Sequence, residues 1–262
     1  MKTANVKVTI RSNDFDQTTQ EEMWSIYQNF YSCSYKSFMS RIARNNYFAM
    51  YTANAKLVGF TSLRVDHQIL EDKKHLFFYF EQTVIDQAYR GESLIQQTGL
   101  KLIVRFAGKL LTSKAYFWAD ALTYQTYLGF TKSLTEYYPS RKSGTPPPAK
   151  QMLNYLGDKH FGNTYSAVTG IIYQATEYGN APSERISSEQ LADPDIRFYV
   201  GSNPFYIRGN GLLVMAPLTK KNLKQLLTSF LRSMYHLPLL KHSKRGLPPY
   251  HNQLGIRALS NL

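Results

Sequence analysis

A turn of charged and small residues separates an apolar segment from an amphipathic one in "FYFEQTVIDQAYRGESLIQQ" (78–97). Gly91 lets the backbone turn tightly and come close to a ligand. Arg90 can give a charge-assisted hydrogen bond to a phosphate, and Ser93 offers a hydroxyl. A helix that begins near Glu92 or Ser93 adds unpaired backbone N–H groups and a partial positive charge. The turn is therefore a candidate phosphate site, although an Arg-Gly turn between a strand and a helix is also common as simple punctuation.

The segments on both sides of this turn predict a mixed α/β domain. Alternating apolar residues predict strands, and apolar residues three or four apart predict helices. Asn54 marks the turn of a hairpin within 47–70. In order, the pattern predicts a strand at 5–12, one or two helices at 18–45 capped by Thr18 or Thr19, the hairpin, a strand at 75–86, a helix at 92–113, a strand at 115–121 and a helix from 122.

The second half of the chain follows a proline-rich segment, "SRKSGTPPPAK", which cannot continue a helix or a central strand. We therefore expect a domain at 1–140, a linker at 141–150 and a C-terminal α+β extension or second half-domain at 151–262. Within the last part, the sequence predicts a helix at 149–162, a strand–turn–strand unit at 198–214 and an amphipathic helix at 219–237.

Composition and charge limit the classes of function. The chain has 262 residues, of which 43% are hydrophobic, and its single cysteine, Cys33, excludes an internal disulfide and a cysteine-based zinc site. No apolar run is long enough to span a bilayer, so we expect a cytoplasmic protein. The formal net charge of +13 favours acidic partners, such as nucleic acid, a phosphorylated cofactor or an acidic protein.

Two motifs in this order resemble a known family. "YFEQTVIDQAYRG" resembles motif A of the GNAT superfamily of acyl-CoA-dependent N-acyltransferases, and "AYFWADALTYQTYLGF" resembles its motif B. The likeness covers about residues 5–140. It implies a GNAT-like mixed, mostly antiparallel sheet flanked by helices, and an enzyme that moves an acyl group from a phosphopantetheine thioester to an amine.

The resemblance also implies roles for individual residues. The backbone of Val84 and Ile85 would hydrogen-bond the pantetheine arm, and Glu81 would be the general base. Tyr124 or Tyr127 would protonate the departing thiolate. The phosphates would be surrounded by main-chain groups of Arg90, Gly91, Glu92, Ser93 and Leu94. These parts suit the chemistry, because an attacking amine must lose a proton and a carboxylate beside an apolar strand has a raised pKa.

The phosphate turn departs from the family pattern at two positions that are usually small, here Ser93 and Ile95. The β-branched Ile95 limits close approach of a pyrophosphate. The donor is therefore either acyl-CoA, bound in an altered pose, or the phosphopantetheine of an acyl-carrier protein, which brings a single phosphate. Carrier proteins are acidic, and a basic enzyme would attract one.

Two other classes of function stay open. A catalytically degenerate member of the fold could act as a sensor or scaffold, with Ile95 as the mark of lost catalysis. A basic protein rich in aromatic residues could also bind nucleic acid by stacking, but the chain has no basic recognition helix and no known RNA-binding motif.

Overall fold

The computed structural model describes residues 6–31, 33–90, 93–173 and 185–234. Eight strands form one sheet in the order β1-β2-β3-β4-β5-β8-β7-β6. Only the β4–β5 pair is parallel, so the sheet is mixed and mostly antiparallel, as the resemblance implies. The strands are β1 (Lys7–Ser12), β2 (Tyr47–Ala53), β3 (Lys56–Leu70), β4 (Lys73–Ile85), β5 (Lys114–Ala121), β6 (Tyr165–Ser166), β7 (Ile171–Ile172) and β8 (Gly211–Pro217).

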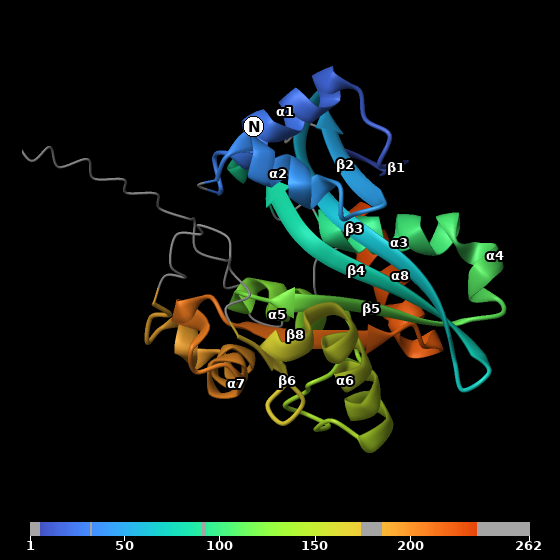
Figure 1. Cartoon of the computed structure of the whole chain (residues 1–262), viewed down its shortest axis with the longest axis vertical. Coiled ribbons are helices and arrows are strands. Elements are labelled where there is room, and N and C mark those ends of the chain that lie inside the picture. The colour runs from blue at the N-terminus through green and yellow to red at the C-terminus, as the bar shows by residue number, and fades with distance from the viewer. Residues whose placement is uncertain (1–5, 32, 91–92, 174–184, 235–262) are drawn as a thin grey trace, which may run out of the picture.

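Helices cover both faces of this sheet (Figure 1). In the first half they follow the predicted order, except that the helix expected at 92–113 is broken at Phe106, whose φ is −105° and ψ 15°. The helices are α1 (Gln17–Tyr27), α2 (Tyr35–Ile42), α3 (Leu94–Arg105), α4 (Ala107–Leu110), α5 (Tyr124–Ser133), α6 (Pro147–Phe161), α7 (Pro194–Ser202) and α8 (Lys220–Met234).

A tight hairpin turn joins β2 to β3. Asn54 and Ala55 both have positive φ, 49° and 62°, the conformation of the tight turn expected between β2 and β3. Of the one or two helices expected after the first strand, there are two, α1 and α2. Asp16 caps the first of them by accepting from the Thr19 N–H at 2.8 Å, so the predicted cap at Thr18 or Thr19 was wrong by a few residues.

The core divides between the two faces of the sheet. On one face, α3, α5, α7 and α8 pack on a cluster that includes Phe78, Leu102 and Phe117. On the other face, α1 and α2 cover one cluster and α6 covers another, which contains Phe77 and Trp118. Alternation along each strand therefore separates neighbours such as Phe77 and Phe78.

Residues beyond 150 contribute strands to the same sheet. β8 pairs with β5 over six residues, and β7 and β6 extend the edge. The strand–turn–strand unit predicted at 198–214 was wrong: α7 occupies its first part, because Asp193 caps a helix with Pro194 at its first turn. The helices expected at 149–162 and 219–237 are α6 and, within the described residues, α8.

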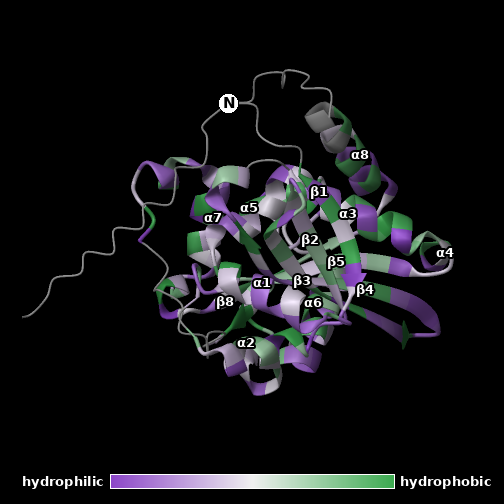
Figure 2. Cartoon of the chain, turned by 90° about the horizontal axis from the view of Figure 1, so that it is seen from above, coloured by the Kyte–Doolittle hydropathy of each residue, from purple (hydrophilic) through white to green (hydrophobic). Residues whose placement is uncertain are grey.

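The last described helix, α8, carries apolar and polar residues on different sides (Figure 2). Its Leu226 is buried in the main core, whereas Leu227 is half exposed. Among the described helices, none combines the length and the apolar character that crossing a bilayer requires.

Candidate active site

The central feature of the site is a gap between two strands. The parallel ladder of β4 and β5 ends at the pair Tyr79–Trp118, yet β4 continues to Ile85 and β5 to Ala121. In Figure 1 the two strands lie side by side at the lower right and diverge toward the left. Along the separated parts, the edges of β4 and β5 that face each other are therefore directed into an opening, whereas their other edges pair with β3 and β8.

Glu81 lies in a β-bulge at the mouth of this gap. Thr61 pairs with Thr83 and Leu63 pairs with Phe80, so one residue of β3 lies opposite two residues of β4 in this interval. The extra residue on β4 re-aims the side chains beside it, as bulges near active sites commonly do. The Glu81 side chain consequently lies on the face that α1, α2 and α6 cover.

A fixed donor and several arginines surround this carboxylate. The Asn45 side chain, only 2% exposed, donates to Glu81 Oε2 and to the Arg41 carbonyl. Burial raises the pKa of Glu81 above its usual value, and the Asn45 hydrogen bond and the charges of Arg64, Arg44 and Arg41 act in the opposite direction. The residue is therefore a half-buried carboxylate suited to proton transfer.

A second carboxylate, Asp120 on β5, lies close enough to Glu81 to feel its charge, and reasoning from the sequence did not select it. The Tyr79 hydroxyl donates to Asp120 Oδ1 at 2.6 Å. Burial raises the pKa of Asp120 to about 7, and the charge of Glu81 adds to that increase. In the structure, Glu81 and Asp120 each follow the pair Tyr79–Trp118 by two residues on parallel strands, a register that the sequence alone does not show.

Arg64 on β3 connects these groups to the second half of the chain. Its guanidinium carbon lies 4.8 Å from the centre of the Tyr79 ring, and Nη2 is 3.1 Å from His160 Nδ1 on α6. Burial, together with the charges of Arg64 and Lys159, lowers the pKa of His160 to about 4. His160 is therefore neutral near pH 7 and accepts from Arg64 without adding charge.

The end of β4 presents its backbone to the gap. The Asp86 N–H donates to the Val58 carbonyl at 2.9 Å, so by alternation Ile85 directs its N–H and C=O away from β3, whereas Val84 directs its own toward Phe60. The Ile85 carbonyl accepts from Arg90 Nε at 3.1 Å. Of the two residues expected to contact a pantetheine arm, Ile85 is the one whose peptide groups face the opening.

Arg90 and the head of α3 lie just beyond Ile85. The Arg90 guanidinium lies over the Phe30 ring, 5.3 Å from its centre, and so also contacts the segment that follows α1. Ser93 is the N-cap of α3, has a left-handed backbone with φ 54°, and makes no side-chain cap. The first intrahelical bond is from Gln97 N–H to the Ser93 carbonyl, so the amides of the first turn have no partner within the helix.

The side chains of this first turn differ in exposure. Leu94 is buried in the core, so only its backbone can serve a ligand, whereas Ile95 is half-buried. Thr98 bonds the Tyr51 hydroxyl at 3.0 Å and thereby fixes α3 against the sheet. The other two predicted residues of the turn, Gly91 and Glu92, lie outside the described residues.

The two candidate tyrosines occupy different positions on α5. Tyr127 is fully buried, and its hydroxyl donates to the Pro139 carbonyl at 3.1 Å; burial raises its pKa well above the usual value. Tyr124 is at the first turn of α5, directly after the end of β5, and its hydroxyl accepts from Gln190 Nε2 at 2.8 Å. Tyr124 is thus the tyrosine nearer along the chain to the gap.

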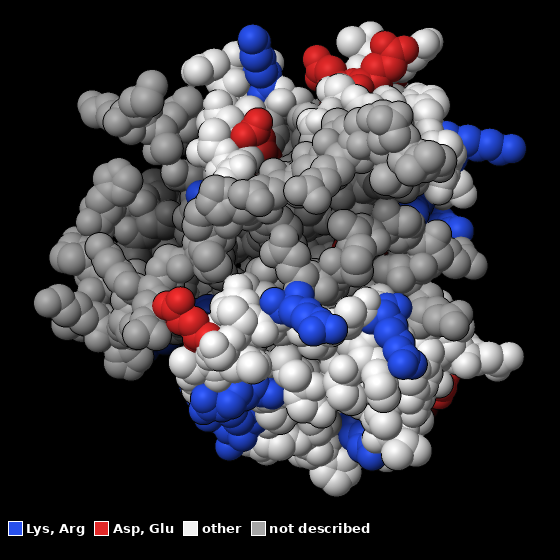
Figure 3. Space-filling view, turned by 90° about the vertical axis from the view of Figure 1, so that its left-hand side faces the viewer, with Lys and Arg blue, Asp and Glu red and all other residues white. Residues whose placement is uncertain are grey.

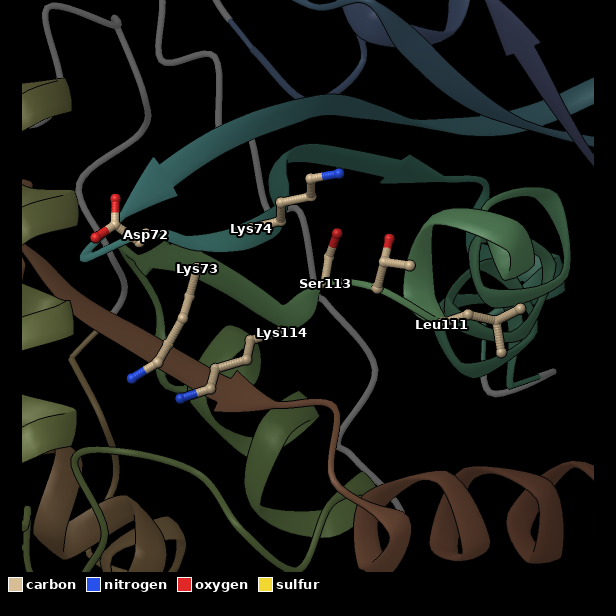
Figure 4. Close-up of a pocket in the computed structure, with 7 residues that line it drawn as sticks. Asp72, Lys73, Lys74, Leu111, Ser113 and Lys114 are labelled. Atoms are coloured by element: carbon tan, nitrogen blue, oxygen red, sulfur yellow. The ribbon is translucent and has the colours of Figure 1, made fainter.

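A separate hollow lies at the other end of β4. It has a volume of about 500 Å³ and is lined mainly by the turn after β3 and the start of β5, with Lys73, Lys74 and Lys114 around it (Figure 4). Lys74 lies eleven positions before Ile85 on β4, which at about 3.3 Å per position corresponds to roughly 36 Å. This hollow is therefore not part of the carboxylate site.

No protein-family model matches the chain, and no curated protein matches it. Among solved structures, those similar to it include acetyltransferases. An aminoglycoside acetyltransferase from an uncultured soil metagenomic sample, in complex with sisomicin, is 15% identical over 49% of this chain and 86% of its own, with a TM-score of 0.36. A ribosomal-protein-alanine N-acetyltransferase from Brucella melitensis biovar Abortus 2308 is 11% identical over 49% and 90%, with a TM-score of 0.38.

A third similar structure is an aminoglycoside N-acetyltransferase in complex with CoA, 12% identical over 47% of this chain and 83% of its own, with a TM-score of 0.34. Another, from Staphylococcus aureus, is described as a GNAT family acetyltransferase and is 14% identical, with a TM-score of 0.31.

Proposed function

We propose that this protein is an N-acyltransferase that moves an acyl group from a phosphopantetheine thioester to an amine. One observation carries the proposal: β4 and β5 separate after Tyr79–Trp118, and Glu81 lies at the mouth of the gap while Ile85 directs its peptide groups into it. An extended arm with amide groups fits such an opening as an added strand would. A raised-pKa carboxylate at the same place suits a base that deprotonates the attacking nitrogen.

The donor's phosphate would lie at the head of α3. The amides of Leu94, Ile95 and Gln96 lack partners within the helix, and the helix dipole favours an anion there. Arg90 would add a charge-assisted bond. The half-buried Ile95 favours a single phosphate over a pyrophosphate, which makes the arm of an acyl-carrier protein a candidate donor beside acyl-CoA.

The protein's charge favours acidic partners as a class. Among the described residues on the face in Figure 3, basic side chains are scattered rather than gathered into one stripe. A net charge of +13 raises the rate of encounter with any acidic partner and makes that rate dependent on salt. The rate of thiol release with each donor distinguishes a carrier protein from CoA.

In this reaction Glu81 is the general base, and Tyr124 protonates the leaving thiolate. The amide of Gln190 donates to the Tyr124 oxygen, and an accepted hydrogen bond makes a hydroxyl a stronger donor. Tyr127 would act through packing, because its hydroxyl bonds the Pro139 carbonyl.

The test measures thiol release from acyl-CoA and acyl-carrier protein, each with a panel of amines. We expect one class of thioester to be consumed in an amine-dependent way, and Glu81→Gln to slow the chemical step by about 10²- to 10⁴-fold. The matched control is Glu71→Gln, in the exposed turn between β3 and β4. Binding of CoA without turnover would instead indicate a sensor or scaffold, and the absence of both binding and turnover would reject the proposal.

A further inference from the structure

We propose that Asp120 is a second catalytic residue, which with Glu81 forms a carboxylate pair that takes both protons lost by an ammonium acceptor. This inference rests on the proposed acyl transfer and extends it to the form of the acceptor. The reacting nitrogen would enter the site as R–NH₃⁺, held between the two carboxylates, rather than as a neutral amine.

The geometry places the two carboxylates at equivalent points of neighbouring strands. The β4–β5 ladder stops at Tyr79–Trp118, and each carboxylate follows two residues later on its own strand. Both are half-buried and lie on the same face of the sheet. Because the strands are separating at this point, the space between the two side chains opens onto the gap that would receive the thioester.

Each carboxylate is held by its own neutral donor. Tyr79 donates to Asp120 at 2.6 Å, and Asn45 donates to Glu81. The indole of Trp118 stacks on Tyr79 with 4.1 Å between ring centres, which fixes the phenol that orients Asp120. A buried charge costs stability unless it is compensated, so a carboxylate at this position is better explained by a catalytic role than by packing alone.

The proton balance of the reaction requires two acceptors. An ammonium loses one proton to become a nucleophile, and the nitrogen loses a second after it has attacked the thioester carbonyl carbon. The attack forms the C–N bond. The tetrahedral intermediate then collapses to the amide as the C–S bond breaks, and the electron pair of that bond leaves with sulfur. Asp120 takes the first proton and Glu81 the second. Tyr124 protonates the thiolate and recovers a proton from one of the two carboxylates. The other carboxylate releases its proton to solvent.

The charged groups that face the pair set the order of these steps. From β3, Arg64 acts on both carboxylates; its own neighbours are Asp66, with Oδ2 3.5 Å from Arg64 Nε, and neutral His160 on α6. From the α2 side, Arg41 and Arg44 act on Glu81. More positive charge therefore faces Glu81 than Asp120, so Asp120 is the carboxylate that exchanges its proton near neutral pH.

The direct test is a titration of the full chain, without substrate, by NMR of ¹³C-labelled carboxyl groups. We expect one aspartate signal to titrate near pH 7 and to vanish in Asp120→Asn. Tyr79→Phe removes a hydrogen bond to the charged form and should raise that pKa, whereas Glu81→Gln removes a negative neighbour and should lower it, each by about one unit. A signal that titrates below pH 5, or that moves in the same direction in both variants, would overturn the proposal.

Activity is then measured against pH to separate this inference from acyl transfer itself. Asp120→Asn should slow turnover and abolish the acidic limb of the kcat profile near pH 7, and Asp120→Glu should restore part of the rate. If the wild-type protein transfers acyl groups and Asp120→Asn keeps that limb, Asp120 is not catalytic although the enzyme is. If no acyl transfer occurs at all, the proposed function fails while the titration still reports whether the pair exists.

Discussion

Replacing Gly59 by alanine should test the close approach of β3 to the end of β4. Gly59 is paired with Ile85, and an added Cβ would lie 2.5 Å from the Val84 carbonyl oxygen and 2.9 Å from the Ile85 Cα. Both contacts are with backbone, so relief requires the two strands to move apart. Overpacking of this kind costs about 1–3 kcal/mol, more than the ~0.5–1 kcal/mol gained by restricting the unfolded chain.

The same movement should weaken binding of the donor, because Ile85 would be displaced from the gap. Chemical denaturation gives the stability change, and calorimetry with CoA gives the affinity. The matched control is Gly129→Ala on α5, whose Cβ would meet nothing within 4 Å and which should stabilise the protein by up to about 1 kcal/mol. If Gly59→Ala is as stable as Gly129→Ala, β3 does not pack closely against the end of β4 and does not hold Ile85 in place.

Three further substitutions probe the packing and electrostatics. The side chain of Asn222 is fully buried, accepts hydrogen bonds from three groups and donates to two carbonyls. Asn222→Ala should therefore lower the free energy of unfolding by about 2–4 kcal/mol in urea denaturation, whereas Asn29→Ala, at an exposed position, should lower it little. Equal losses would contradict the hydrogen-bond network. Ser93→Gly, at positive φ, should be neutral or stabilising by up to about 1 kcal/mol, whereas Ser113→Gly should destabilise by about 0.5–1 kcal/mol; the reverse order would refute the left-handed turn before α3. Because the folded-state pKa of Asp120, about 7, exceeds the unfolded value of about 3.9, the native state holds this proton more firmly and stability should fall as pH rises from about 4 to 7. Thermal denaturation at several pH values should show a smaller fall for Asp120→Asn, and parallel curves would argue against the raised pKa.

Much of the fold could be predicted because its signals are local. The alternation of Val8 and Ile10, the turn at Asn54 and the apolar run of β4 each lie within a few neighbouring residues. The prediction at 198–214 was wrong because it relied on local strand propensity alone. Aromatic and β-branched residues in "FYV" favoured a strand, but Ile196 and Tyr199, three residues apart, are the buried face of a helix.

The candidate site was only partly predictable. Glu81, Ile85 and Arg90 lie along one strand and its following turn, so a motif could select them together. Asp120 and His160 come from β5 and α6, and only the parallel pairing of β4 with β5 and the packing of α6 on the sheet bring them to the same face. Long-range contacts of this kind have no signature in a single sequence.

The most direct measurement of the central claim is backbone NMR or hydrogen exchange during titration with CoA and with phosphopantetheine. We predict that the amide of Ile85 and those of Leu94 to Gln96 shift and become protected together, because the arm lies in the gap between β4 and β5 and its phosphate at the head of α3. Saturable binding that leaves these four amides unchanged, while other parts of the molecule respond, would contradict it.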